Sequence, residues 1–220
     1  MWGLIMKKFI ISMTLCLPTL AMAQPSSQIA WTAEQINFVK AGNPAKGEQL
    51  AKSCAACHGE KGISATPGYP SLAGQLANYL FKQLQDYASG ARQNPLMNGI
   101  AGGLSKQDAA DLANWFAQQQ GAFQSRSPMV YERAEKLVKG GSRDRVLPPC
   151  EVCHGTDGKG HVMDTPALSG QSAEYISAVL KAFKTGERHN DIYSRMRLIA
   201  ESLTDAEIEE LGFYYQNIKP

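Results

Sequence analysis

A duplicated pentapeptide constrains the fold of this 220-residue chain more than any other feature of its sequence. The pattern Cys-Xaa-Xaa-Cys-His occupies residues 54–58 and recurs at residues 150–154, 96 positions later. Twelve residues after each histidine comes a proline, Pro70 or Pro166, within the related segments PSLAGQ and PALSGQ. Such a repeat indicates an internal duplication, so we expect the two halves to fold as two copies of one unit.

The two halves remain aligned far beyond the repeated motif. The offset of 96 persists to Arg92 and Arg188, and a three-residue insertion then raises it to 99, which aligns Met97 with Met196. A second insertion, of nine residues, precedes the second motif. The alignment predicts equivalent structural positions for each pair of residues, and the insertions mark where the halves differ.

Both halves carry helix signals at corresponding places, and no strand-like alternation of apolar and polar residues competes with them. Capping residues, a proline at a first helical position and terminating glycines indicate where the helices begin and end. The predicted helices cover residues 43–51 and 129–139, residues 77–89 and 173–185, and final segments that open at Ser105 and Thr204. We therefore predict an all-α protein with two tandem domains.

The first 23 residues have the three-part layout of a secretory signal peptide. Two lysines are followed by an apolar run at residues 9–17 and by the small-residue ending Ala21-Met22-Ala23. We expect cleavage after Ala23 and export to the periplasm as a soluble protein, because the run is too short to span a bilayer comfortably. The alternative is an uncleaved anchor, with peripheral association at the membrane.

The remaining chain divides into two domains of ordinary size. Residues 24–121 form the predicted first domain, residues 122–128 a linker without helical periodicity, and residues 129–220 the second domain. Aromatic residues make up only 8% of the chain, which would leave such domains poorly filled unless a large apolar group lay inside each. The composition therefore favours an enclosed macrocycle.

The distribution of charge argues against a nucleic-acid partner. The formal net charge of +2 comes from 22 basic and 20 acidic residues, with no run of Lys or Arg that would follow a phosphate backbone. The two lysines of the signal peptide account for the excess, so the exported chain is formally neutral. We therefore do not expect long-range electrostatic steering to govern partner docking.

The repeated motif has the spacing of a covalent haem attachment site. In a helical turn, cysteines at positions i and i+3 come to the same side and can form thioethers with the two vinyl groups of haem. The following histidine then reaches the iron, and a methionine thioether from a loop on the opposite face completes the coordination of a low-spin carrier. The predicted attachment cysteines are Cys54, Cys57, Cys150 and Cys153, and the predicted iron ligands are His58 with Met97 and His154 with Met196.

Two other chemistries use paired cysteines. A thiol–disulfide pair favours a βαβ context, which the helical pattern lacks. One tetrahedral zinc ion could use both pairs, but the interval between them is long and a four-sulfur site does not need the histidines. We therefore predict two covalently attached haem c groups, one in each half, because the downstream proline and methionine are duplicated with the motif.

Over residues 40–220 the chain resembles the dihaem cytochromes c of the cytochrome c4 type. The resemblance lies in the segments CAACHG and CEVCHG, YPSLAGQ and TPALSGQ, YLFKQLQDYASGAR, and KGGSRDRVLPPCEVCHG. It implies two class I cytochrome c domains related by a pseudo-twofold axis, each around one covalent haem. It also implies that the carbonyls of Pro70 and Pro166 accept the second ring N–H of His58 and His154.

Arg92 and Arg188 follow helix-ending glycines at equivalent positions of the two halves. A guanidinium group binds carboxylates well, so we consider both arginines as ligands for haem propionates; the alternative is a pair of surface arginines. The longer loop before Met196 contains His189, which is the alternative ligand for the second iron. The difference in loop length also predicts different redox potentials for the two irons.

The predicted function is one-electron transport without substrate turnover, because His and Met ligands leave no open position on either iron. The resemblance implies a periplasmic carrier whose acceptor is a terminal oxidase, and we expect a quinol-oxidising complex or a dehydrogenase as the donor. The alternatives are a dihaem enzyme, either a peroxidase or a thiosulfate-oxidising cytochrome, and a cytochrome subunit of a dehydrogenase complex.

Overall fold

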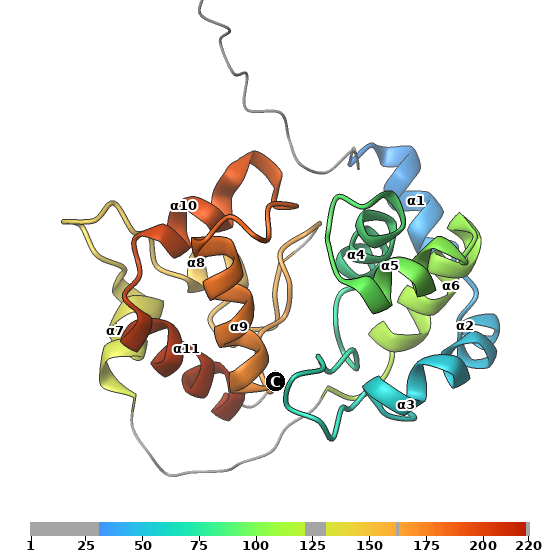
Figure 1. The fold of residues 1–220 in the computed structure, drawn as a ribbon, viewed down its shortest axis with the longest axis horizontal. Helices are drawn as coiled ribbons and strands as arrows, with labels where there is room; N and C mark the ends of the chain where they lie inside the picture. Colours follow the sequence, from blue (N-terminus) through green and yellow to red (C-terminus); the bar gives the residue numbers. More distant parts are fainter. Residues whose placement is uncertain (1–30, 122–130, 162, 219–220) are drawn as a thin grey trace, which may run out of the picture.

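The computed structural model describes residues 31–121, 131–161 and 163–218. Within these ranges the regular elements are helices, apart from two isolated β-bridges, Ser142–Leu147 and His161–Thr165. Figure 1 shows two groups of helices side by side, one from each half of the chain. The prediction of an all-α, two-domain protein is therefore confirmed.

Two of the sequence predictions fall outside the described residues. These are the signal peptide with cleavage after Ala23 and the linker at residues 122–128. The exact domain boundaries consequently stay predictions. No helix in the described ranges is long and apolar enough to cross a membrane.

Six helices and one 3₁₀ turn build the described part of the N-terminal half (Figure 1). They are α1 (Ala33–Lys40), α2 (Pro44–Ala51), η1 (Lys52–Cys54), α3 (Ala55–His58), α4 (Ala77–Ser89), α5 (Pro95–Gly102) and α6 (Lys106–Ala117). Helix α6 packs against α1, α2 and α4, and α5 packs against α4. The side chains buried where these helices meet include Val39, Leu80, Phe81, Leu112 and Phe116.

The C-terminal half repeats this packing. Its elements are α7 (Glu132–Gly140), α8 (Glu151–His154), α9 (Ala173–Lys184), η2 (Ile192–Ser194), α10 (Arg195–Glu201) and α11 (Asp205–Asn217). Helix α11 packs against α7 and α9, and α10 packs against α9. The core includes Leu137, Val138, Ile176, Ile208 and Leu211. Helix α1 has no counterpart among the described helices of this half.

The capping signals of the sequence mark the observed helix ends. Asn43 caps α2, with its side-chain oxygen accepting the backbone N–H groups of Ala45 and Lys46. Ser105 and Thr204 open α6 and α11 with complete capping boxes, which satisfy N–H groups that otherwise lack a partner. These local hydrogen bonds explain why the sequence predicted the beginnings of these helices correctly.

The methionine segments differ from the prediction. We expected Met97 and Met196 on loops, but both lie in short helices, α5 and α10. Helix α5 begins with the cap Asn94 and Pro95 at its first position, a signal that the sequence analysis overlooked. Each short helix packs against the middle helix of its own half, and this packing stabilises an element too short to be stable alone.

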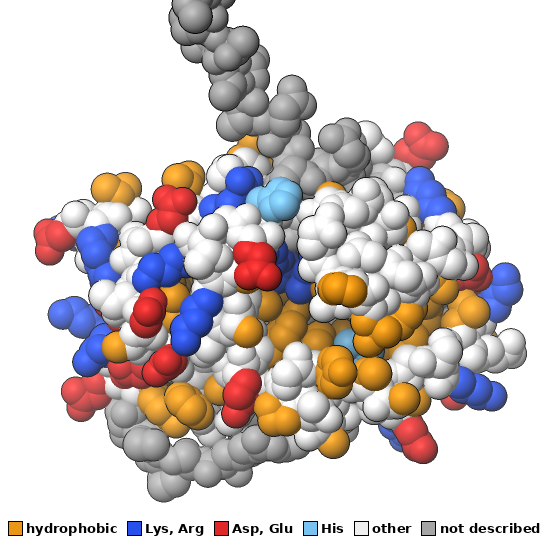
Figure 2. Space-filling model, viewed as in Figure 1, with side chains coloured by type: hydrophobic (Ala, Val, Ile, Leu, Met, Phe, Trp, Pro, Cys, Tyr) orange, Lys and Arg blue, Asp and Glu red, His pale blue; other side chains and the backbone are white. Residues whose placement is uncertain are grey.

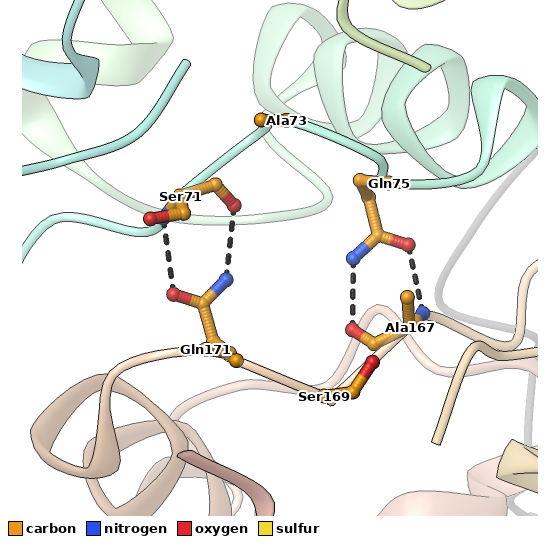
Figure 3. Close-up of a pocket in the computed structure, with 7 residues that line it drawn as sticks. Ser71, Ala73, Gln75, Ala167, Ser169 and Gln171 are labelled. Atoms are coloured by element: carbon orange, nitrogen blue, oxygen red, sulfur yellow. Dashed lines mark hydrogen bonds between the residues drawn. The ribbon is translucent and has the colours of Figure 1, made fainter. Parts of the chain in front are cut away.

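The two halves meet through a reciprocal pair of glutamines (Figure 3). The Gln75 amide donates to the carbonyl of Ala167 at 3.0 Å and accepts the Ala167 N–H at 2.8 Å. The Gln171 amide makes the same pair of bonds to Ser71, at 2.9 and 3.0 Å. Gln75 and Gln171 are equivalent in the repeat, and so are Ser71 and Ala167. The two pairs of bonds therefore follow the pseudo-twofold relation between the domains.

Candidate haem sites

Each repeated motif folds as a single helical turn. In the first, the N–H of Gly59 donates to the Ala55 carbonyl, and in the second the N–H of Gly155 donates to the Glu151 carbonyl, both at 2.9 Å. Gly59 has a φ of 81°, and a Cβ there would lie 2.0 Å from the Ile63 carbonyl oxygen, so only glycine fits. The turn brings the i and i+3 sulfurs to one side, as thioether attachment to one macrocycle requires.

Both motif histidines are buried and held by a proline carbonyl. The Nδ1 atom of His58 lies 2.8 Å from the Pro70 oxygen, and that of His154 lies 3.0 Å from the Pro166 oxygen. The contacts that the resemblance implied are therefore present. With the Nδ1 proton donated to the carbonyl, Nε2 keeps a lone pair for a metal ion.

The protonation of these histidines suits a metal ligand. Burial lowers the pKa of His58 and His154 below the ordinary value, although the hydrogen bond to the proline carbonyl opposes this effect. A histidine must be neutral to coordinate iron, so a lowered pKa keeps the ligand form available over a wider pH range.

The cysteines do not resemble a reactive dithiol. All four are free of disulfide bonds, and burial raises the pKa of Cys54 and brings that of Cys150 to about 11. Reactive dithiols depend on a lowered thiol pKa. Among the described residues, no group of three or more His, Cys, Asp or Glu side chains is arranged to hold a metal ion.

The two methionines are half-buried and occupy equivalent helices. The alternative ligand His189 lies beyond the end of α9, with Nδ1 3.3 Å from the carbonyl of Glu187 two residues earlier. His161 is exposed, and its backbone N–H donates to Thr165 in one of the β-bridges. Met97 and Met196 thus lie in corresponding short helices, although only Met196 is among the residues that pack against the core cluster of its half, and the two remaining histidines lie in loops.

Arg92 and Arg188 lie at the interface between the halves. Arg92 donates to the hydroxyl of Tyr175 at 3.0 Å, and Arg188 donates to the hydroxyl of Tyr79 at 3.2 Å, so each arginine bonds across to the other domain. Both also donate to the Gln83 side-chain oxygen, at 2.8 and 3.0 Å. Arg92 is only 8% exposed, so the surface alternative is wrong for this residue.

The two guanidinium groups create a positive potential at this interface. Burial by itself would raise the pKa of Tyr79, yet the charges of Arg188 and Arg92 lower it below its ordinary value. A lowered tyrosine pKa means that the surroundings favour a negative charge. The arrangement therefore fits anionic groups such as carboxylates.

Sequence reasoning missed a second polar cluster beside these arginines. Lys82 and Asp86, both 1% exposed, form an ion pair on α4. Asn190 from the other half joins them, because its carbonyl accepts from Lys82 at 2.7 Å and its amide donates to Asp86 at 2.6 Å. A break in the repeat could have revealed the cluster, since Ala178 and Ala182 stand at the matching positions of α9.

The comparisons with known proteins agree with this geometry. The Cytochrome c family matches residues 44–120. Cytochrome c4 from Azotobacter vinelandii is 37% identical over 189 residues, covering 81% of this chain and 90% of the relative. A thiosulfate dehydrogenase electron acceptor from Stutzerimonas stutzeri strain A1501 is 39% identical over 173 residues, covering 76% and 80%.

A solved structure extends the likeness over both domains. The crystal structure of reduced recombinant cytochrome c4 from Pseudomonas stutzeri superposes with a TM-score of 0.78 at 37% sequence identity. The match covers 81% of this chain and 100% of the crystallised chain. The chain belongs to the cytochrome c4 family of dihaem c-type electron carriers.

Proposed function

We propose that the two haems of this carrier are ligated by His58 with Met97 and by His154 with Met196. The observation that carries the proposal is the repeated contact between each imidazole Nδ1 and a proline carbonyl, at 2.8 and 3.0 Å, which leaves Nε2 as the metal-binding atom. When bound, haem supplies an iron that gains and loses one electron. The motif cysteines would attach it, the proline carbonyls would orient the imidazoles, and Met97 and Met196 would supply the other iron ligand in each half.

The same ligand set favours a carrier over a dihaem enzyme. A peroxidase or a thiosulfate-oxidising cytochrome needs an iron with an open or replaceable position. Each half of this chain instead provides a methionine on a helix packed against its own middle helix. We therefore propose a carrier without substrate turnover.

We propose that Arg92, which is buried, and Arg188, which is half-buried, receive the haem propionates. Arg92 and Arg188 bring two positive charges to the domain interface, where Tyr79 and Tyr175 supply hydroxyl groups beside them. Propionates are negative carboxylates, and a guanidinium group binds them with charge-assisted hydrogen bonds. Propionates at this interface would bring the two haems near one another, which favours electron exchange between them.

The proposed location is the periplasm, with the predicted signal peptide cleaved after Ala23 and with peripheral membrane association as the alternative. We propose a quinol-oxidising complex or a dehydrogenase as the electron donor and a terminal oxidase as the acceptor. A relative named as a thiosulfate dehydrogenase electron acceptor supports the dehydrogenase. It also favours the second candidate, a cytochrome subunit of a dehydrogenase complex, which co-purification with an enzyme partner would reveal.

Binding of carbon monoxide to the reduced protein tests the ligand assignment. The wild-type protein should bind no carbon monoxide, while Met97→Ala and Met196→Ala should each open one of the two haems. His189→Ala and Met163→Ala are the controls, because the first removes the alternative ligand and the second a methionine without a repeat partner. Carbon monoxide binding by the wild-type protein, or opening by His189→Ala, would contradict the proposal.

A further inference from the structure

The helix that carries Met97 is held by neutral hydrogen bonds close to it in the sequence. The Asn94 side chain accepts the N–H of Met97 at 3.0 Å. The Asn98 amide donates to the carbonyls of Tyr87 and Arg92, at 2.7 and 2.8 Å, and so ties α5 to the end of α4. This attachment contains no ion pair and depends little on the ionic strength of the solution.

The helix that carries Met196 begins under backbone strain. The two residues before α10, Tyr193 and Ser194, have φ angles of 57° and 58°, in the left-handed region that favours glycine. Ser194 stands at the cap position without a side-chain hydrogen bond, and the Tyr193 side chain is 80% exposed. The start of α10 therefore lacks the local cap that α5 has, and strain of this kind persists only where other contacts hold the segment.

Two ion pairs provide the missing contacts. Asp191 accepts the backbone N–H of Arg197 at 3.0 Å and its Nε at 2.8 Å. Nη2 of Arg195, the residue before Met196, lies 2.9 and 2.8 Å from the two carboxylate oxygens of Asp164. Asp164 belongs to the loop between α8 and α9, so this second pair joins the methionine helix to a distant segment of the chain.

The Asp164–Arg195 pair exists only in the C-terminal half. The repeat places Gly68 and Leu96 at the two corresponding positions of the N-terminal half, and neither can form an ion pair. The Asp164 side chain is 12% exposed and that of Arg195 is 47% exposed. An ion pair with one partner so exposed is weak enough to be broken by salt and strong enough to bias a local equilibrium.

We infer that Arg195 is a positioning residue for Met196, and that its pair with Asp164 is a clasp that holds α10 to the loop between α8 and α9. The inference rests on the proposed role of Met196 as an iron ligand. Loss of the clasp lets the strained segment relax and withdraws the thioether for part of the time. The sixth position in the C-terminal domain is thus exchangeable under conditions that leave Met97 in place.

Titration of the ferric holoprotein with imidazole tests the clasp. The weak long-wavelength sulfur-to-iron absorption band reports the bound methionine. The apparent affinity for imidazole rises with the fraction of molecules in which the methionine is not bound to the iron. Arg195→Gln and Asp164→Asn should each raise this affinity roughly 1.5- to fivefold at one haem, as expected for loss of one partly exposed ion pair. The double variant should add nothing further, and Arg195→Lys should restore part of the wild-type value.

Added sodium chloride gives a second readout. It should raise the imidazole affinity of the wild-type protein towards that of Arg195→Gln and raise that of the variant less, because the variant retains only the Asp191–Arg197 pair for salt to screen. Repeating the titration in a Met97→Ala background assigns the effect, since the remaining band then belongs to Met196.

Two controls separate the clasp from a general loss of charge or stability. Leu96→Gln changes the matching position of the N-terminal half, and Lys184→Gln breaks an exposed ion pair with Asp205 in the C-terminal half. Neither should change the band or the imidazole affinity. If the clasp variants behave like these controls while Met196→Ala removes one band, the clasp is wrong and the ligand assignment stands. If Met196→Ala removes no band, the ligand assignment itself fails.

Discussion

The two domains share one arrangement of helices but differ in where their ion pairs lie. In the N-terminal domain the charged cluster is buried, with Lys82 and Asp86 on the middle helix. In the C-terminal domain the matching positions are alanines, and ion pairs hold the segments created by its insertions instead. On the face that Figure 2 shows, charged side chains are frequent over the C-terminal half, and hydrophobic ones gather where the halves meet and continue over the N-terminal half.

The comparison indicates which features of the repeat serve the cofactor. The motif turn, the proline carbonyl and the methionine helix recur in both domains, whereas the charged clusters do not. The nine-residue insertion provides an example, because it carries Arg145, which donates to Glu207 in the capping box of α11 at 2.8 and 2.9 Å. The elements that carry the proposed haem ligands are thus duplicated, while the ion pairs that stabilise each domain differ.

The largest expected effect comes from the buried pair of the N-terminal domain. Asp86→Ala should cost about 3–5 kcal/mol of folding stability, because it leaves the Lys82 charge buried without its partner. The double change Lys82→Ala with Asp86→Ala should recover part of this loss, because it removes the unpaired charge but leaves the buried carbonyl of Asn190 without the donor Lys82. Chemical denaturation of the holoprotein, followed by haem absorbance, measures both values. A double variant as unstable as the single one would show that the pair serves another purpose.

The capping boxes of α6 and α11 should contribute unequally to folding stability. Glu207→Gln should cost about 2 kcal/mol, because it removes the charge that Arg145 binds, although glutamine can still close the capping box. The matched change Asp108→Asn on α6 should cost less, about 0.5–1 kcal/mol, since that carboxylate interacts with Ser105 alone in its box. Thermal unfolding of the two variants tests the ranking, and equal losses would contradict it.

The pH dependence of stability provides a check on Glu207. The hydrogen bond from Arg145 is the largest influence that lowers the pKa of this carboxyl, from 4.5 to about 2. A lowered folded-state pKa stabilises the fold above the unfolded value, and this contribution is lost as the pH falls from about 4.5 towards 2. Stability should therefore decline less steeply through this range in Glu207→Gln than in the wild-type protein.

The two interface glutamines should contribute equally to folding stability. Gln75→Ala and Gln171→Ala each remove two hydrogen bonds to the backbone of the opposite domain, and each should cost about 1–2 kcal/mol. Differential scanning calorimetry should give nearly equal losses for the two variants. A large inequality would mean that the reciprocal bonds do not contribute equally and that the pseudo-twofold relation is only geometric.

A modest separation is expected between the two redox potentials. The different bracing of α5 and α10 should split them by about 40 mV, equivalent to ~1 kcal/mol for one electron. A spectroscopic redox titration should resolve two one-electron components. A single component with a one-electron slope would mean that the insertions have no influence on the irons.

Local signals explain how much could be predicted from the sequence. The motif turn, the capping boxes at Ser105 and Thr204 and the apolar spacing of the middle helices depend on residues within a few positions of one another. The helices that carry Met97 and Met196 were missed because they are short and gain stability from packing against α4 and α9. Their place in the repeat was nevertheless correct.

The sequence by itself predicted the cofactor framework, because Cys, His and Pro recur at the same spacing in both halves and a methionine follows at the matching position of the repeat. Only the tertiary structure decided what Arg92, Arg188, Asp164 and Arg195 contact. These side chains bond to partners far away in the sequence, and such pairings arise only when two domains or two loops come together. Long charged side chains can reach many partners, so spacing alone does not select among them.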